Sequence, residues 1–183
     1  MVKTRLEALN FIVTVKTGTN ATTADATGKA LVVISSTVTP TSVGTKFRTV
    51  AVPVVLWESG LYGDMGITST TNTSFGTATK QTQVKIINPT HPMADGLLGQ
   101  PGVTTVSGTL TWGKPNANAV SVATLVGDTT KIVIFGYEQG AVMPGLTAPA
   151  RRVGLFMFDT TAENFYIPGQ RLFDAAIKWA VGR

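Results

Sequence analysis

The sequence predicts one three-layer α/β domain, with a mostly parallel sheet, flanking helices and an added β-rich segment in the middle of the chain. Two short apolar runs, at 30–35 and 53–57, have the composition of parallel strands that are covered on both faces. Further strand patterns and helical patterns flank these runs, and this mixture is typical of layered α/β domains. At 183 residues, the chain has the length of a single domain, 1–183, with a substantial hydrophobic core.

The N-terminal part is predicted to begin with an amphipathic helix over 2–9, because Val2, Leu6 and Leu9 fall on one helical face. Asn10 can end this helix. The elements expected to follow are a strand at 11–15, a strand at 30–35, a short helix at 42–50 and a strand at 53–57.

The rest of the sequence predicts five strands and a final helix. Gly, Pro and Asn turn signals separate strands at 83–87, 103–110, 119–125, 131–136 and 152–158. In the final helix, Phe173, Ile177 and Val181 recur at helical spacing. Gly182 supplies the stop, and the positive charge of Lys178 suits the C-terminal end of the helix dipole.

The composition argues against several classes of site and partner. The chain has no cysteine, which excludes disulfides, thiolate metal sites and a Cys nucleophile. Its one histidine cannot form a site with several imidazole ligands, and no Asp-x-Asp-x-Asp loop supports a Ca²⁺ site made of carboxylates alone, so we expect no metal. We also expect no cofactor. The net charge is +5, but the basic residues are scattered and only Arg151–Arg152 are adjacent, so we expect no nucleic-acid partner.

The same composition bears on location. No apolar window reaches the roughly 18 residues of a membrane span, and the N-terminus has no signal-peptide pattern. Charged residues make up only 14% of the chain, and Thr and Gly are frequent. Such charge-poor surfaces are common among exported bacterial proteins, so we expect an extracellular or cell-surface location, with the export signal outside this chain.

Four segments carry a more specific pattern: ALVVISSTV, VPVVLWESGLYGDMGIT, NPTHPMADGL and IFGYEQGAVMPGLTAPARRVGLF. Together they resemble the class I glutamine amidotransferase-like superfamily, in particular its trehalose-utilisation-type branch. Domains of this kind occur as modules of large exported bacterial proteins, beside sugar-related or adhesive modules. The resemblance implies a flavodoxin-like sheet and an association with carbohydrate. If the chain is instead expressed as a truncated reading frame, we expect the protein to be cytoplasmic.

The resemblance also implies a missing strand. The family fold begins with a central parallel strand, whereas this chain begins within the helix that follows that strand. We therefore expect a chain that is truncated at its N-terminus, naturally or by excision. In the flavodoxin-like order, the missing strand would lie between the strands at 30–35 and 53–57. Because unpaired backbone in a sheet is costly, we expect another strand or a neighbouring chain, including a second copy, to fill the slot.

Enzymes of the superfamily place a Cys on a tight strand-to-helix turn and complete the site with a His and a Glu after a later strand. An overlay on this sequence puts Ser59 at the Cys position, Gly136 at the His position and Glu138 at the Glu position. A Ser nucleophile needs an adjacent base, and the candidates are Glu138 and His91. We expect His91 to be a loop or packing residue, and one of Arg151–Arg152 to pair with Glu138.

A ligand site is the second prediction from this overlay. Glu58 and Glu138 would form a carboxylate pair if both strand ends met at the carboxyl edge of the sheet, where α/β sheets bind ligands. Trp57, Tyr62, Tyr137 and Trp112 would then offer flat faces to a sugar ring. The alternative is that the aromatic residues belong to the core or its rim and that Glu58 is a solvated turn residue.

Two functions compete on these grounds. We predict a non-catalytic binding or assembly module with a carbohydrate or small-molecule ligand, because the catalytic Cys and His are absent. The alternative is a hydrolase of an ester or lactone that uses Ser59, with His91 or Glu138 as base. Acyl transfer requires the Ser59 hydroxyl to lie within about 6 Å of one of those bases. A sugar-acting enzyme would need carboxyl groups about 5–9.5 Å apart, at Glu58 and Glu138.

Overall fold

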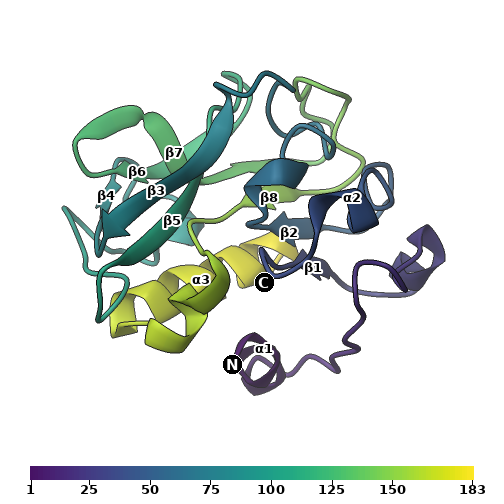
Figure 1. Ribbon diagram of the computed structural model, residues 1–183, viewed down its shortest axis with the longest axis horizontal. Coiled ribbons are helices and arrows are strands. Elements are labelled where there is room, and N and C mark those ends of the chain that lie inside the picture. The colour runs from purple at the N-terminus through teal and green to yellow at the C-terminus, as the bar shows by residue number, and fades with distance from the viewer.

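A computed structural model describes residues 1–183, apart from the side chain of residue 160. A mixed sheet with eight strands forms its centre, and helices lie on both sides of that sheet (Figure 1). The strands are β1 Val32–Ile34, β2 Val54–Leu56, β3 Phe75–Gln81, β4 Val84–Ile86, β5 Gly108–Gly113, β6 Val120–Leu125, β7 Asp128–Tyr137 and β8 Arg152–Gly154. The α-helices are α1 Val2–Ala8, α2 Pro40–Val43 and α3 Ile167–Ala180, and the 3-10 helices are η1 Thr23–Ala26, η2 Ser59–Leu61, η3 Pro92–Ala94 and η4 Asp159–Asn164.

The fold is α/β as predicted, but its sheet is mostly antiparallel. Only β1–β2 and β2–β8 pair in parallel, while five further pairs are antiparallel. The reason lies in β7, which pairs with β8, β6 and β5 and runs against all three. Gly127, at φ +85°, makes the tight turn that joins β6 to β7 as a hairpin. The expectation of a mostly parallel sheet is therefore wrong.

The expected slot in the sheet is also absent. β1 and β2 pair directly, with Val32 opposite Val54 and Ile34 opposite Leu56. The amide of Val32 donates to the carbonyl of Pro53, which continues the ladder beyond the strand. No gap remains between these two strands for an inserted strand or a neighbouring chain. The unpaired side of β1 is instead its outer side, because β1 is the first strand of the sheet.

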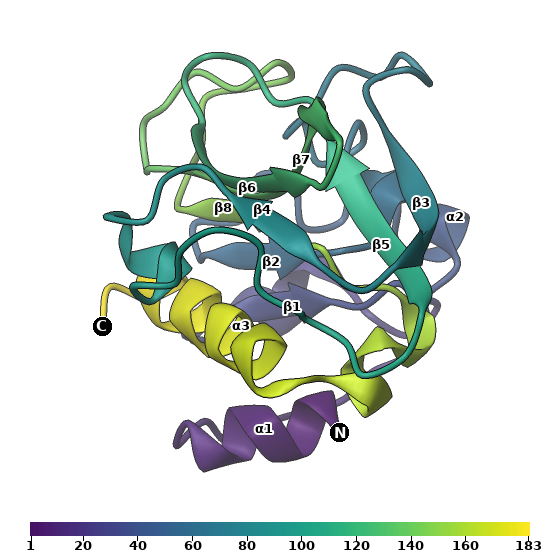
Figure 2. The same cartoon turned by 90° about the vertical axis from the view of Figure 1, so that its left-hand side faces the viewer.

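Each face of the sheet has its own hydrophobic core. The first core, which we call the α3-side core, includes Trp57, Phe156 and Phe173 and is covered by α3. Figure 2 shows α1 alongside α3, and the guanidinium of Arg5 joins them by an ion pair with Asp174 at 2.6 Å. The second core lies on the opposite face and includes buried side chains from α2 and from the segment after β2. No helix among the described residues has the length and apolar character that a membrane span needs.

Local patterns predicted several elements well. Strand patterns at 30–35, 53–57, 83–87 and 119–125 contain observed strands, the pattern at 131–136 lies within the longer β7, and α1 matches the helix expected at 2–9. The final helix is longer at its start than the periodic residues indicated, because Pro168 stands in its first turn. It buries Leu172, Phe173 and Ile177 against the sheet.

Other elements differ from the prediction. The segment 11–15 is not a strand, because no described strand pairs with it. The helix expected at 42–50 forms earlier, as α2, and the strand expected at 103–110 begins only at Gly108. The strand expected at 152–158 ends at Gly154. β3 was missed because its sequence, FGTATKQ, has few of the apolar residues that mark a strand.

Candidate functional site

The candidate residues lie at two opposite edges of the parallel strands. β1, β2 and β8 run in one direction, so the residues before them form an amino edge and the residues after them a carboxyl edge. Tyr137, the last residue of β7, pairs with Arg152, and Arg152 pairs with Val54, the first residue of β2. Glu138 therefore lies at the amino edge. The segment 57–59 follows β2 and lies at the carboxyl edge.

The strand register gives the scale of this separation. Because Tyr137 aligns with Val54 through Arg152, Glu138 aligns with Pro53, five positions before Glu58. At about 3.3 Å per residue, five positions correspond to roughly 16 Å along the strands. The condition for a carboxylate pair, that both strand ends meet at one edge, is therefore not met. Glu58 and Ser59 do not share a cleft with Glu138.

At the carboxyl edge, Glu58 serves the backbone. Its side chain accepts a hydrogen bond of 2.9 Å from the amide of Gly60 and caps η2, which begins at Ser59. Burial raises the pKa of Glu58, and the nearby charge of Asp159 raises it further. Ser59 stands on a turn after a buried strand, as a nucleophile would. Its hydroxyl makes no hydrogen bond with an acid or an imidazole among the described side chains.

The aromatic residues named as sugar platforms are buried. Trp57 belongs to the α3-side core, where its ring meets the edge of Phe173 at 6.1 Å. The hydroxyl of Tyr62 donates to the carbonyl of Leu155 at 3.1 Å. The hydroxyl of Tyr137 donates to the carbonyl of Ile67 at 3.0 Å. These three rings belong to the core, and the two tyrosine hydroxyls have hydrogen-bond partners, which is the alternative that the sequence left open.

At the amino edge, Glu138 forms an ion pair with Arg151. The two guanidinium–carboxylate distances are 2.6 and 3.3 Å, in a bidentate arrangement. The same guanidinium lies 4.6 Å from the centre of the Trp179 ring and donates to the carbonyl of Trp179. The predicted pairing of Glu138 with one of the two adjacent arginines is confirmed, and the partner is Arg151.

His91 lies on the same side of the sheet as Glu138. Its Nδ1 accepts a hydrogen bond of 3.2 Å from the amide of Met93 and caps η3, and its ring meets Trp179 edge-on at 5.3 Å. Burial lowers the pKa of His91, while the charges of Glu138 and Arg151 act on it in opposite directions. His91 thus has the loop and packing role expected from the sequence. It is not placed beside Ser59.

Gly136, which the sequence overlay placed at a catalytic histidine position, has no room for a side chain. A Cβ atom on Gly136 would lie 2.6 Å from the Trp179 ring and 3.1 Å from the terminal methyl group of Met93. Atoms at such distances overlap, so Trp179 occupies the space that a residue at this position would need.

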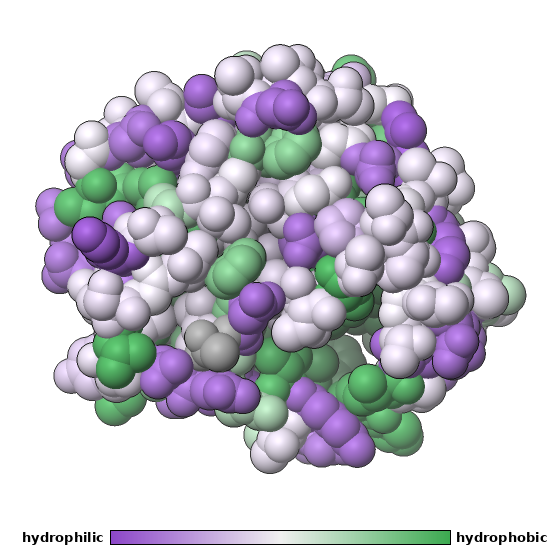
Figure 3. Space-filling view, viewed as in Figure 1, coloured by the Kyte–Doolittle hydropathy of each residue, from purple (hydrophilic) through white to green (hydrophobic). Residues whose placement is uncertain are grey.

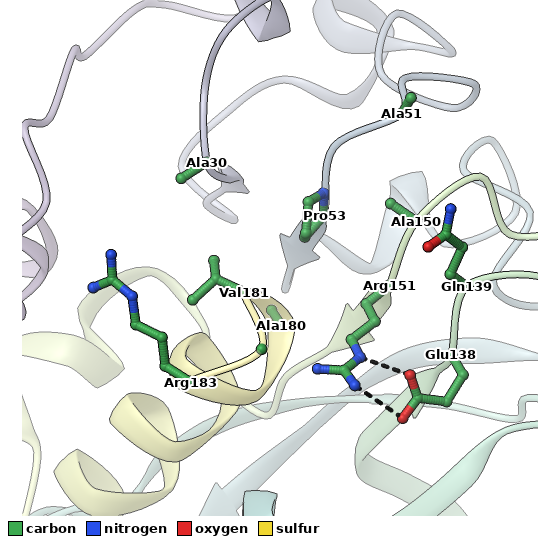
Figure 4. A pocket seen from close by; sticks show the side chains of 11 residues that line it. Ala30, Ala51, Pro53, Glu138, Gln139, Ala150, Arg151, Ala180, Val181 and Arg183 are labelled. Carbon is green, nitrogen blue, oxygen red and sulfur yellow. Dashed lines mark hydrogen bonds and ion pairs between the residues drawn. The ribbon is translucent and has the colours of Figure 1, made fainter.

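An open pocket of about 510 Å³ lies at the amino edge (Figure 4). We call it the amino-edge pocket. In Figure 4, the Glu138–Arg151 pair lies on one side of it and Arg183 on the other. Its lining residues are Ala30, Ala51, Pro53, Glu138, Gln139, Ala150, Arg151, Ala180, Val181, Gly182 and Arg183. The pocket therefore combines small apolar walls with two cations, one carboxylate and one amide.

The sequence prediction did not include this pocket, because it placed the site at the carboxyl edge of the sheet. A positional signal was present in the sequence: Ala30 and Pro53 begin two predicted strands, and Arg151 stands just before a third. Residues that precede parallel strands gather at one edge, as residues that follow them do.

No group of three or more His, Cys, Asp or Glu residues in the described part of the chain could hold a metal ion. Comparisons with protein-family models, with curated proteins and with solved structures found no match to this chain.

Proposed function

We propose that this chain is a non-catalytic binding or assembly module on a glutamine amidotransferase-like scaffold, carried by an exported bacterial protein. The observation that supports it best is the separation of the candidate catalytic groups. Ser59 follows β2 at the carboxyl edge, whereas Glu138 follows β7 at the amino edge. A serine without an adjacent base is a poor nucleophile, so this arrangement disfavours acyl transfer.

The amino-edge pocket is the proposed ligand site. Its guanidinium, carboxylate and amide groups offer both donors and acceptors within a space of about 510 Å³. Specific recognition of small ligands depends on a few polar groups set in an apolar wall, and alanines supply that wall here. The ligand class is a small polar molecule, with carbohydrates as its first candidates because of the sequence resemblance.

Hydrolysis assays test the non-catalytic part of this proposal. Purified protein is incubated with an activated ester, a lactone and an aryl glycoside, beside Ser59→Ala and Glu138→Gln. We expect the rates of all three proteins to equal the buffer rate. Turnover by the parent protein that is lost in Ser59→Ala would support the hydrolase and overturn the proposal. Turnover that is lost only in Glu138→Gln would overturn it as well.

Ligand titrations test the binding part. Trp179 lies under the Arg151 guanidinium at 4.6 Å, so its fluorescence should report on occupancy of the pocket. We expect a saturable change with at least one sugar in a panel of neutral, amino and acidic sugars. Gln139→Ala should weaken it, whereas Gln100→Ala, outside the pocket, should not. No change with any sugar, or equal binding by both variants, would contradict the proposed site.

A further inference from the structure

The outer side of β1 is an unpaired sheet edge. The amide of Val32 donates toward β2, and the carbonyl of Ile34 accepts from the amide of Trp57. Backbone groups alternate along a parallel strand, so the amide and carbonyl of Val33 point away from β2. No described residue forms a hydrogen bond with them. Val33 is only half-buried, so this edge is open to another strand.

A second unpaired segment lies in the same chain. The stretch 12–16, with the sequence IVTVK, makes no backbone hydrogen bond with any described residue. Its β-branched residues favour extended backbone. Phe11 and Val13 pack against the α3-side core, whereas Ile12 is 100% exposed and Val15 is 71% exposed. The sequence therefore specifies a strand-forming segment that lacks a partner strand among the described residues.

Both features lie on one side of the molecule. In Figure 1, the chain leaves α1, passes through this segment at the lower right and returns to β1. Figure 3 shows apolar side chains gathered in the same region, in the same view. A surface that carries both a free strand and a free sheet edge is self-complementary. Two copies related by a two-fold axis can then satisfy each other, as a closed dimer requires.

We propose that two copies of this chain associate by reciprocal strand addition, in which the segment 12–16 of each copy pairs with the outer edge of the partner's β1. Phe11 and Val13 keep their places in their own core, so no part of either copy has to unfold. Ile12 and Val15, which project to opposite faces of an extended strand, both lose exposure to water when the segment pairs with β1. The main-chain groups of both segments gain partners, as in other complexes formed by strand addition.

This inference names the partner for the assembly part of the proposed function, and it uses no pocket residue and no candidate catalytic residue. Its readout is molecular mass, whereas the proposed function is tested by turnover and by ligand binding. A monomeric protein would overturn strand addition and leave non-catalytic binding standing. Turnover that depends on Ser59 would overturn the proposed function and leave the dimer standing.

The test is native mass spectrometry and sedimentation of the full chain between about 1 µM and about 1 mM, a range that brackets weak dimers. The test variant is Ile12→Lys with Val15→Lys, whose side chains are exposed in the single copy and so should not alter its stability. The matched control is Leu98→Lys, since Leu98 is an apolar residue with 72% exposure elsewhere on the surface.

We expect a dimer for the parent protein and for the control. The double variant should associate at least about tenfold more weakly, because burying an unpaired lysine ammonium group in the interface costs free energy. Hydrogen exchange at the Val33 amide should slow with concentration in the parent protein and stay fast in the double variant. A monomer at every concentration would overturn the proposal. So would a dimer that both lysines leave intact, or an open series of larger species.

Discussion

Arg152 offers the most decisive test of how the amino edge is built. The side chain is fully buried at the start of β8, and no described carboxylate pairs with it. Its guanidinium instead donates to backbone carbonyls at distances of 2.7 to 3.3 Å. The acceptors are the carbonyls of Arg48, Val50, Val52, Ala150 and Arg151. Burial lowers the pKa of Arg152 to about 10, so the guanidinium remains charged at neutral pH.

We predict that Arg152→Met lowers the free energy of unfolding by about 3 kcal/mol. Each buried acceptor left without a donor costs about 1–3 kcal/mol. The three closest acceptors, on Val50, Val52 and Ala150, lie within 3.1 Å of the guanidinium. Their summed loss is partly offset because a buried charge, which costs several kcal/mol of desolvation, is removed. Water that reaches the loop at exposed Ala51 offsets a further part.

Urea unfolding, followed by tryptophan fluorescence, measures this loss, and thermal unfolding should show a midpoint lower by about 6–12 °C. Arg152→Lys keeps the charge but not the planar fork, so its loss should be intermediate. Arg171→Met is the matched control. Arg171 pairs with Asp95 at 2.6 Å, but their side chains are 46% and 43% exposed, and such pairs contribute about 0–1 kcal/mol. A difference of less than about 1 kcal/mol between Arg152→Met and Arg171→Met would refute a stabilising role for the hydrogen bonds from Arg152 to the backbone carbonyls.

Three further predictions follow from local contacts. Gly136→Ala should cost about 1–3 kcal/mol in unfolding experiments, because its Cβ would overlap the Trp179 ring at 2.6 Å. Gly108→Ala, also in a strand but with no atom nearer than 3.9 Å, should be close to neutral, and equal stability of the two variants would contradict this packing. Burial raises the pKa of Glu58, so the folded state binds more protons than the unfolded state and stability falls as pH rises through this pKa. The free energy of unfolding of Glu58→Gln, measured between pH 4 and pH 7, should not show this decrease. A variant with the same pH dependence as the parent protein would contradict the desolvation of Glu58. NMR titration of the single histidine should give His91 a pKa below 6.5, with a loss of folded stability as pH falls through 6.5, and a higher pKa would contradict its burial.

Elements with strong local patterns were predictable from the sequence. β2 reads as a continuous apolar run because both of its faces are buried. α3 reads as a helix because its buried residues repeat at helical spacing. The segment 11–15 has an equally apolar sequence and yet forms no strand. A strand depends on a partner that supplies hydrogen bonds, and local composition does not reveal whether that partner exists.

The candidate site shows the same division. The pairing of Glu138 with an adjacent arginine was predictable, because unlike charges near the ends of neighbouring strands attract. The buried role of the tyrosines was visible as an alternative. The edge at which each group lies was not predictable, because it depends on the direction of β7. That direction follows from the hairpin with β6 and from pairing with β8, which lies about fifteen residues later in the chain.

The sequence by itself determined which chemistry is absent. A chain without cysteine has no thiolate nucleophile, and a chain with one histidine has one imidazole to offer. These facts depend only on residue types, which folding does not change. The tertiary structure decided where the remaining groups lie. It placed Ser59 and Glu138 at opposite edges of one sheet and filled the space beside Gly136 with Trp179. Distances between groups far apart in the chain depend on strand direction and register, which are set by long-range pairing.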